Sequence, residues 1–239
     1  MAKERLQKYM AASGVDSRRN CERFIVEGVV KVNGHVVDTL PAFVDPEVDT
    51  VTVRGRKLKE AVKLYFLLNK PKGVLCTNYD PEGRPRAIDF IATSHRIFCV
   101  GRLDAETTGL IILTNDSEMV NRLTHPKYEL PKKYQARLRG SITPEAVEQL
   151  RSGVWLPEGK MQISGLKVVK KSTKESLVEM TTSKGLSTDI SRAFLKVGFK
   201  VLGLKREQIG KITSKGLDLG KSRPLTKSEV NYLKAATSK

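Results

Sequence analysis

Hydrophobic and polar residues follow two different periods over the first 60 positions. Apolar residues at helical spacing predict one helix that ends at Ser13-Gly14 and a second helix over residues 18–27. An Asn33-Gly34 pair between two valine-rich runs is a strong signal for a two-residue hairpin. We therefore predict a small first domain over residues 1–60, made of two helices followed by a small sheet.

Residues 61–239 form the predicted second domain, and a charged stretch at 55–63 is interpreted as the linker. Strand-like and helix-like segments follow one another in this domain without regular βαβ alternation, which favours an α+β fold over a doubly wound sheet. The strands are expected at 64–68, 97–100, 110–113, 134–138 and 177–181, and the helices at 117–123 and 189–197.

The chain is strongly basic. Its 239 residues include 43 Lys and Arg against 26 Asp and Glu, which gives a net charge of +17 and a pI near 9.8. Nucleic acid is favoured over a membrane as the partner, because no apolar run approaches the roughly 18 residues of a spanning helix. Three cysteines and three histidines are too few and too scattered for a disulfide framework or a zinc site. The N-terminus lacks the apolar segment of a secretory signal, so we expect a cytoplasmic protein.

Positive charge is concentrated in two places. Arg18, Arg19 and Arg23 cluster on the second predicted helix, although the first 60 residues carry a net charge of only +2. Residues 191–239 hold 12 basic and 3 acidic side chains, a net charge of +9. A solvated face is the ordinary interpretation of such a run, whereas with a polyanionic partner it becomes a surface that follows phosphates. The three arginines would then grip structured RNA by its shape.

The densest candidate for chemistry is the stretch VGRLDAETTGLIILTND at residues 100–116. A predicted strand ends at Gly101, a polar loop presents Arg102 and Asp104, and the next strand starts after Gly109. A carboxylate on a rigid loop beside an arginine can act as a nucleophile or as a proton acceptor. An aspartate in such a loop is more commonly a turn or cap residue, so the pattern by itself leaves both interpretations open.

This stretch resembles the G-R-L-D-x-x-T-x-G-L-L-x-L-T-N-D signature of the pseudouridine synthases, in the RsuA/RluB family. The first 60 residues resemble the S4-like RNA-binding domain that members of this group carry at the N-terminus. Further resemblances to family motifs are L-N-K-P-x-G at 68–73, H-P-x-Y at 125–128, K-x-Y at 132–134 and the segment near the end at 223–226.

The resemblance implies a catalytic domain with a mixed, mainly antiparallel sheet that isomerises a uridine of ribosomal RNA to pseudouridine, without a metal or an organic cofactor. Asp104 would attack the flipped uridine and Tyr134 would stack on its base, unless Tyr134 is simply a half-buried strand residue. Arg102 would fill the gap left by the base or bind its phosphate. Lys70 would support the wall of the site or contact the substrate. The segment D-P-E-G-R-P at 80–85 resembles the large-subunit branch, which points to 23S-type RNA.

One motif departs from the family pattern. Residues 185–198 correspond to G-R-x-x-Q-V-K/R-R-M-F-x-x-V-G, but Ser191 stands at the basic position expected to pair with the nucleophilic aspartate and keep it ionised. Arg192 comes next, and we expect it to support Asp104 and bind substrate instead. The alternative is a weakened or inactive homologue that serves as an rRNA-binding ribosome-assembly factor. The enzyme is favoured because the loop of Asp104 is intact, and its partner is expected to be ribosomal RNA or a pre-ribosomal particle, bound by a monomer.

Overall fold

The chain, in a computed structural model that describes residues 3–59, 61–183 and 187–238, divides into two compact units. The first unit runs to Leu64 and includes two short returns of the chain, at 93–96 and 115–117. The second unit contains the rest. Each unit has its own buried hydrophobic residues, so each is described by itself.

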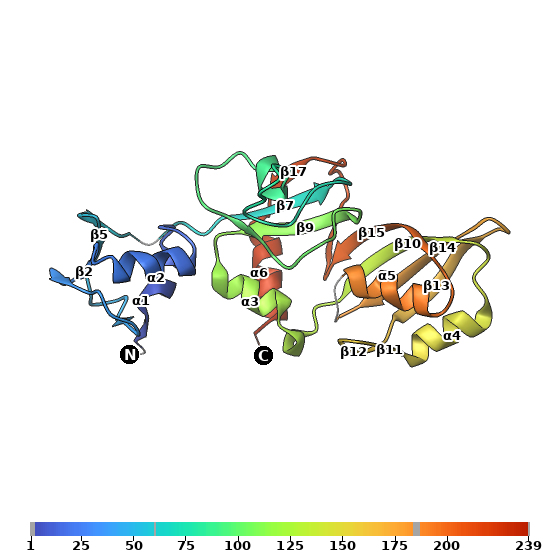
Figure 1. Ribbon diagram of the computed structural model, residues 1–239. Helices are drawn as coiled ribbons and strands as arrows, with labels where there is room; N and C mark the ends of the chain where they lie inside the picture. The colour runs from blue at the N-terminus through green and yellow to red at the C-terminus, as the bar shows by residue number, and fades with distance from the viewer. Residues whose placement is uncertain (1–2, 60, 184–186, 239) are drawn as a thin grey trace. The chain divides into compact units, whose positions relative to one another are not determined.

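The first unit packs two short helices, α1 and α2, against small sheets (Figure 1). Leu6 and Met10 of α1 are buried, as are Cys21 and Ile25 of α2, and the spacing of four residues places each pair on one helical face. The main sheet has the order β3-β2-β5-β6, and β1 pairs separately with β4. The bounds are α1 Leu6–Ala12, α2 Arg18–Val26, β1 Glu4–Arg5, β2 Val30–Val32, β3 His35–Val36, β4 Phe43–Val44, β5 Val51–Val53 and β6 Arg56–Lys57.

Two tight turns shape this sheet. Asn33 and Gly34 have φ values of 53° and 86°, the left-handed pair that a two-residue type I′ hairpin needs, so the predicted hairpin is confirmed. Arg54 and Gly55 adopt the same conformations, with φ values of 48° and 77°, and join β5 to β6. The prediction that 55–63 is a linker is therefore wrong at its start, because the charged residues there form a hairpin strand.

The second unit is built on a nine-stranded sheet in the order β13-β14-β10-β15-β9-β7-β17, with β16 beside β15 and β8 beside β9. The pair β15–β9 is parallel and the other described pairs are antiparallel, so the predicted α+β class with a mixed, mainly antiparallel sheet is confirmed. The strands, including the separate hairpin β11–β12, are β7 Tyr65–Lys70, β8 Phe98–Cys99, β9 Thr108–Thr114, β10 Lys132–Arg139, β11 Val154–Leu156, β12 Gly159–Met161, β13 Ser164–Lys171, β14 Glu175–Thr182, β15 Val201–Ile209, β16 Ile212–Thr213 and β17 Ser222–Pro224.

Helices cover both faces of this sheet, and strand β9 lies between them (Figure 1). Ile111 and Leu113 face the core that contains residues of α4 and α5, whereas Leu110 and Ile112 face the core that contains residues of α3 and α6. A continuous apolar run is typical of a strand buried on both faces. The loop that enters β9 is thus held by a strand anchored in two cores. The helices are α3 Ser117–Thr124, α4 Pro144–Ser152, α5 Ser187–Lys196 and α6 Lys227–Ala236, with short 3₁₀ turns η1 Ala87–Phe90 and η2 Pro126–Tyr128.

Several elements of the second unit escaped the sequence patterns. Strand β13 is exposed at every position except Leu166, so it lacks the alternation of a half-buried strand. Strand β15 carries Arg206 at a buried position, which interrupts its apolar pattern. Helices α4 and α6 begin at capping residues Thr143 and Thr226, and these caps are signals that the pattern analysis missed. Among the described residues, no helix is long and apolar enough to cross a membrane.

Candidate active site

Asp104 lies in the loop between β8 and β9 and is held by the first turn of α5. The Ser187 hydroxyl accepts a hydrogen bond from the Asp104 backbone N–H at 3.0 Å and donates one to Asp104 Oδ2 at 2.9 Å. The Thr188 hydroxyl donates to the other carboxylate oxygen, Oδ1, at 2.8 Å. We call Asp104, Ser187 and Thr188 the carboxylate clamp. Because Asp104 remains partly exposed, the clamp fixes its orientation without closing it off.

Arg192 does not belong to the clamp. Its guanidinium forms an ion pair with Glu158, and no basic residue in the described part of the chain forms an ion pair with Asp104. Arg192 lies one helical turn beyond Thr188, about 6 Å further along the axis, whereas the carboxylate sits at the start of α5. The prediction that Arg192 supports Asp104 is therefore wrong. The first part of that motif, at 184–186, lies outside the described residues.

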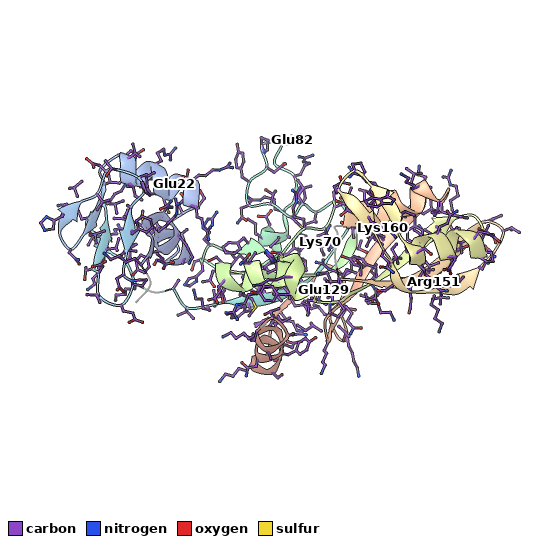
Figure 2. The ribbon with its side chains drawn as sticks, turned by 90° about the horizontal axis from the view of Figure 1, so that it is seen from below. Glu22, Lys70, Glu82, Glu129, Arg151 and Lys160 are labelled. Atoms are coloured by element: carbon purple, nitrogen blue, oxygen red, sulfur yellow. The ribbon has the colours of Figure 1, made fainter. Side chains whose placement is uncertain are left out.

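Lys70 ends strand β7 and is completely buried; Figure 2 shows it in the interior of the second unit. Its ammonium group donates to the backbone carbonyls of Pro71 at 3.2 Å, Val74 at 2.8 Å and Ala105 at 3.2 Å. Burial lowers the pKa of Lys70, and the negative charges of Cys76 and Asp104 partly offset that effect. Ala105 follows the candidate nucleophile directly, so Lys70 ties down the floor of the catalytic loop. The expected direct contact with substrate is wrong, because the side chain has no exposed surface.

Tyr134 and a buried arginine, Arg206, face one another across neighbouring strands β10 and β15. Tyr134 is 1% exposed, and its hydroxyl accepts a hydrogen bond from Arg206 Nη1 at 3.4 Å. Arg206 is 4% exposed, and its Nε donates to the Leu110 carbonyl at 2.6 Å. Sequence analysis did not single out Arg206, although a basic residue inside an otherwise apolar run (VLGLKREQI) was a visible signal.

A cavity of about 70 Å³ is lined by Tyr134, Arg206, Arg102 and Lys132. The rest of its lining is apolar or small, and none of the lining residues is acidic. Burial, together with the charge of Arg206, lowers the pKa of Lys132 to about 8. The structure thus brings together three of the sequence-stretch candidates' neighbours: the exposed Arg102 of the Asp104 loop, the predicted base-stacking Tyr134 and an unpredicted pair of cations.

Gly109 explains how β15 approaches β9 closely enough to form this cavity. A Cβ atom at Gly109 would lie 2.3 Å from the Arg206 carbonyl oxygen and 2.7 Å from the Arg206 backbone nitrogen. Its φ of 101° is also a conformation that residues with side chains rarely adopt. The glycine of the T-T-G-L element is therefore required by packing, and it sets the backbone position from which Arg206 reaches Tyr134.

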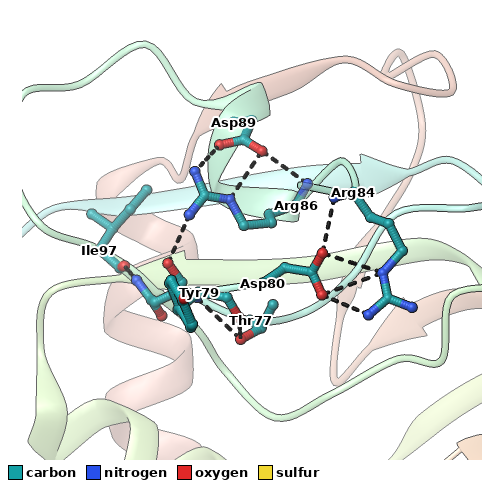
Figure 3. Close-up of polar contacts among 8 residues, drawn as sticks. Thr77, Tyr79, Asp80, Arg84, Arg86, Asp89 and Ile97 are labelled. Carbon is teal, nitrogen blue, oxygen red and sulfur yellow. Dashed lines mark hydrogen bonds and ion pairs between the residues drawn. The ribbon is translucent and has the colours of Figure 1, made fainter. Parts of the chain in front are cut away.

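The segment 80–85 forms a braced loop (Figure 3). The Asp80 carboxylate accepts hydrogen bonds from the backbone N–H and the guanidinium of Arg84, and these bonds lower the pKa of Asp80. The guanidinium of Arg86 donates in the same way to the Asp89 carboxylate. Two arginine–aspartate pairs thus hold a loop that contains little hydrophobic core of its own, and Figure 2 shows Glu82 at its outer tip.

In the first unit, the three arginines predicted to bind RNA are all exposed on α2. Arg23 forms an ion pair with Glu27 at 3.5 Å and lies 5.9 Å from the centre of the Phe24 ring. Arg18 and Arg19 form no ion pair with any residue that the structure describes. Their charges are therefore the ones left for an external anion.

The fold and this site define an RNA-modifying enzyme class, and comparison with known proteins agrees. Residues 64–196 match the RNA pseudouridylate synthase family, and residues 4–47 match the S4 domain. The chain is 41% identical over 235 residues to ribosomal large subunit pseudouridine synthase B of Bacillus subtilis, covering 97% of this chain and 96% of that protein. The protein of the same name in Pseudomonas aeruginosa is 36% identical, covering 96% of this chain and 61% of the relative.

A solved structure described as a pseudouridylate synthase superposes with a TM-score of 0.69 at 30% identity, covering 96% of this chain and 99% of the other. The chain belongs to the RNA pseudouridine synthase family and carries an N-terminal S4 domain. The resemblance expected from the sequence motifs is therefore confirmed, together with the enzyme class.

Proposed function

We propose that this chain isomerises a uridine of large-subunit ribosomal RNA to pseudouridine, with Asp104 as the nucleophile. The printed names of its Bacillus and Pseudomonas relatives support the large-subunit substrate. The carboxylate clamp supports the role of Asp104. Both carboxylate oxygens are oriented by hydroxyl groups while the side chain stays accessible, and Arg102, two residues earlier, lines the cavity that contains Tyr134.

The reaction requires the target base to leave the RNA stack, which costs a few kcal/mol. Tyr134 and the apolar walls of the cavity would replace the lost stacking, and Arg102 would contact the displaced nucleotide. The bond between C1′ and N1 then breaks, the detached uracil turns, and its C5 bonds to C1′. The Asp104 carboxylate can start this sequence by adding to the ribose, by adding to the pyrimidine ring or by removing a proton.

Two basic surfaces would bring RNA to this site. Arg18 and Arg19 of the S4 domain are exposed and without ion pairs to described residues, which suits contact with phosphates. The chain from 191 to 239 adds a net charge of +9. A ribosomal RNA or pre-ribosomal particle would bind a single copy of the chain, because one chain supplies the clamp, the cavity and both basic surfaces. A bacterial ribosomal substrate places the reaction in the cytoplasm.

A second function is supported by one observation. Asp104 lacks an ion pair with any basic residue that the structure describes, which fits a homologue that binds ribosomal RNA during assembly without modifying it. The clamp argues for the enzyme, because two hydroxyl donors aimed at one accessible carboxylate are unnecessary in a binding protein.

The change Asp104→Asn separates the two functions. It retains the size and shape of the side chain but removes the nucleophile, so we expect RNA binding to persist and pseudouridine formation to stop. Large-subunit RNA transcripts would be treated with purified protein, and pseudouridine would be mapped by carbodiimide-dependent primer-extension stops. Wild-type-level modification by the Asn variant would refute the role of Asp104, and absence of modification by the unaltered chain would favour the assembly factor.

A further inference from the structure

Arg206 is a buried cation without an anionic partner. Its Nε and Nη1 atoms are occupied by the Leu110 carbonyl and the Tyr134 hydroxyl, but Nη2 is buried without a hydrogen-bond partner among the described residues. A buried guanidinium normally pairs with a carboxylate, because burying an unpaired charge is costly. An arginine that served only to brace strands would have its donors satisfied by protein groups. The free Nη2 donor therefore indicates a ligand that arrives from outside the chain.

The cavity around Arg206 indicates the chemistry of this ligand. Its volume of about 70 Å³ exceeds several-fold the roughly 10–15 Å³ that one water needs. Aliphatic residues such as Ile112, Leu123 and Ile209 share the lining with Tyr134 and with the cations Arg206 and Lys132. Apolar and aromatic walls suit the faces of a flat ring, and they suit a phosphate group poorly. The cationic donors suit electron-rich carbonyl oxygens at the ring edge.

We propose that Arg206 stabilises the negative charge that develops on uracil when it detaches from the ribose. This role rests on the proposed function, since it assumes that the target uracil enters the cavity beside Tyr134. The Nη2 donor would bond to a carbonyl oxygen of the ring, and Lys132 would add a second positive charge at the same edge. Preorganised donors aimed at developing charge are effective in a site with little water.

The electron balance of the cleavage step requires such a group. When the C1′–N1 bond breaks, its electron pair leaves on N1, so uracil becomes a monoanion with charge spread over N1 and the two carbonyl oxygens. On the sugar side, C1′ bonds to an oxygen of the Asp104 carboxylate, or the 2′ proton passes to that carboxylate as a double bond forms. When C5 bonds to C1′, the electron pair of the anion forms the new bond and the carboxylate is restored. The C5 proton is then lost to a base and N1 gains a proton, which leaves an isomer of the starting nucleoside.

The test compares two leaving groups. Fluorine at C5 withdraws electrons and makes the detached base a more stable anion, so a 5-fluorouridine RNA should depend less on Arg206 than a uridine RNA. Single-turnover loss of the N-glycoside would be measured by nuclease digestion and mass spectrometry for the unaltered chain, Arg206→Met and Arg206→Lys. Arg151→Met is the matched control, because Arg151 is exposed on α4 and hydrogen-bonds only to a backbone carbonyl.

We expect Arg206→Met to slow cleavage of the uridine RNA about 100-fold and cleavage of the 5-fluorouridine RNA about 10-fold, with RNA affinity within twofold of the unaltered chain. Such losses are typical of removing one donor to a developing anion. Arg206→Lys should fall between, because it retains charge without the fork of donors. Equal losses on both RNAs, no loss on either, or a loss confined to RNA affinity would overturn the proposal. Thermal unfolding of both Arg206 variants shows whether an equal loss reflects misfolding. Pseudouridine formation by the unaltered chain tests the proposed function separately, because the inference depends only on the ratio between variants.

Discussion

The carboxylate clamp makes a quantitative prediction about catalysis. Ser187→Ala removes one hydrogen bond to the Asp104 carboxylate and the acceptor of the Asp104 backbone N–H. Thr188→Val removes the bond to the other carboxylate oxygen while retaining the side-chain shape. A hydrogen bond to a charged group contributes about 1.5–3 kcal/mol, and the lower value applies here because Asp104 is partly exposed and water replaces some of the loss.

A loss of about 1.5 kcal/mol corresponds to a rate about 10-fold lower for each single variant. The double variant frees both carboxylate oxygens, so its rate should fall about 100-fold if the two bonds act independently. The loss should appear in kcat, because the clamp orients Asp104 and does not contact the RNA. Single-turnover rates at saturating enzyme, together with filter-binding affinities, separate the two quantities.

Ser191→Ala is the matched control, since Ser191 lies on the same helix and makes no side-chain hydrogen bond to a described residue. It should retain the rate of the unaltered chain. The reasoning fails if the double variant keeps its full rate, or if its defect lies entirely in RNA affinity. The same experiment with Arg192→Ala should leave kcat unchanged, because Arg192 pairs with Glu158.

Three further predictions concern packing, pH and RNA binding. Gly109→Ala should lower the free energy of unfolding by about 3 kcal/mol or more in urea titrations, because its Cβ would overlap the Arg206 backbone, whereas Gly203→Ala on the same strand has open space and should cost about 1 kcal/mol or less. The pKa of Lys132 is about 8 in the folded chain and about 10.4 when unfolded, so folding disfavours its charged form and its contribution to stability should rise between pH 8 and pH 10.4, by at most about 3 kcal/mol. Lys132→Met should remove that rise, and a pH dependence identical to that of the unaltered chain would contradict the assignment. Arg18→Ala with Arg19→Ala should weaken RNA binding and make its salt dependence shallower while kcat stays constant; an unchanged salt slope would show that α2 does not contact phosphate.

Local features of this chain followed from neighbouring residues. The Asn33-Gly34 hairpin was predictable because two consecutive left-handed residues strongly favour that pair. Helix α2 begins where the sequence places Ser17, whose hydroxyl accepts a hydrogen bond from the backbone at the start of the helix. The apolar run of β9 announced a strand buried on both faces, and the motif before it placed Asp104 in a loop. In each case a short stretch carries the whole physical cause.

The surroundings of Asp104 were decided by the tertiary structure. Ser187 lies 83 positions away, and a serine at that position carries no local signal of its role. Sequence adjacency favoured Arg192 as the partner, but the start of α5 faces the carboxylate and places Arg192 a turn away, beside Glu158. Lys70 looked equally suited to substrate or support until its complete burial against three carbonyls showed support. Arg206 and Tyr134, 72 positions apart, meet because β10 and β15 pair and because Gly109 lets β15 approach β9. Contacts at such separations depend on which strands and helices pack together, and that choice is made by the free energy of the whole core, which no single stretch of residues contains.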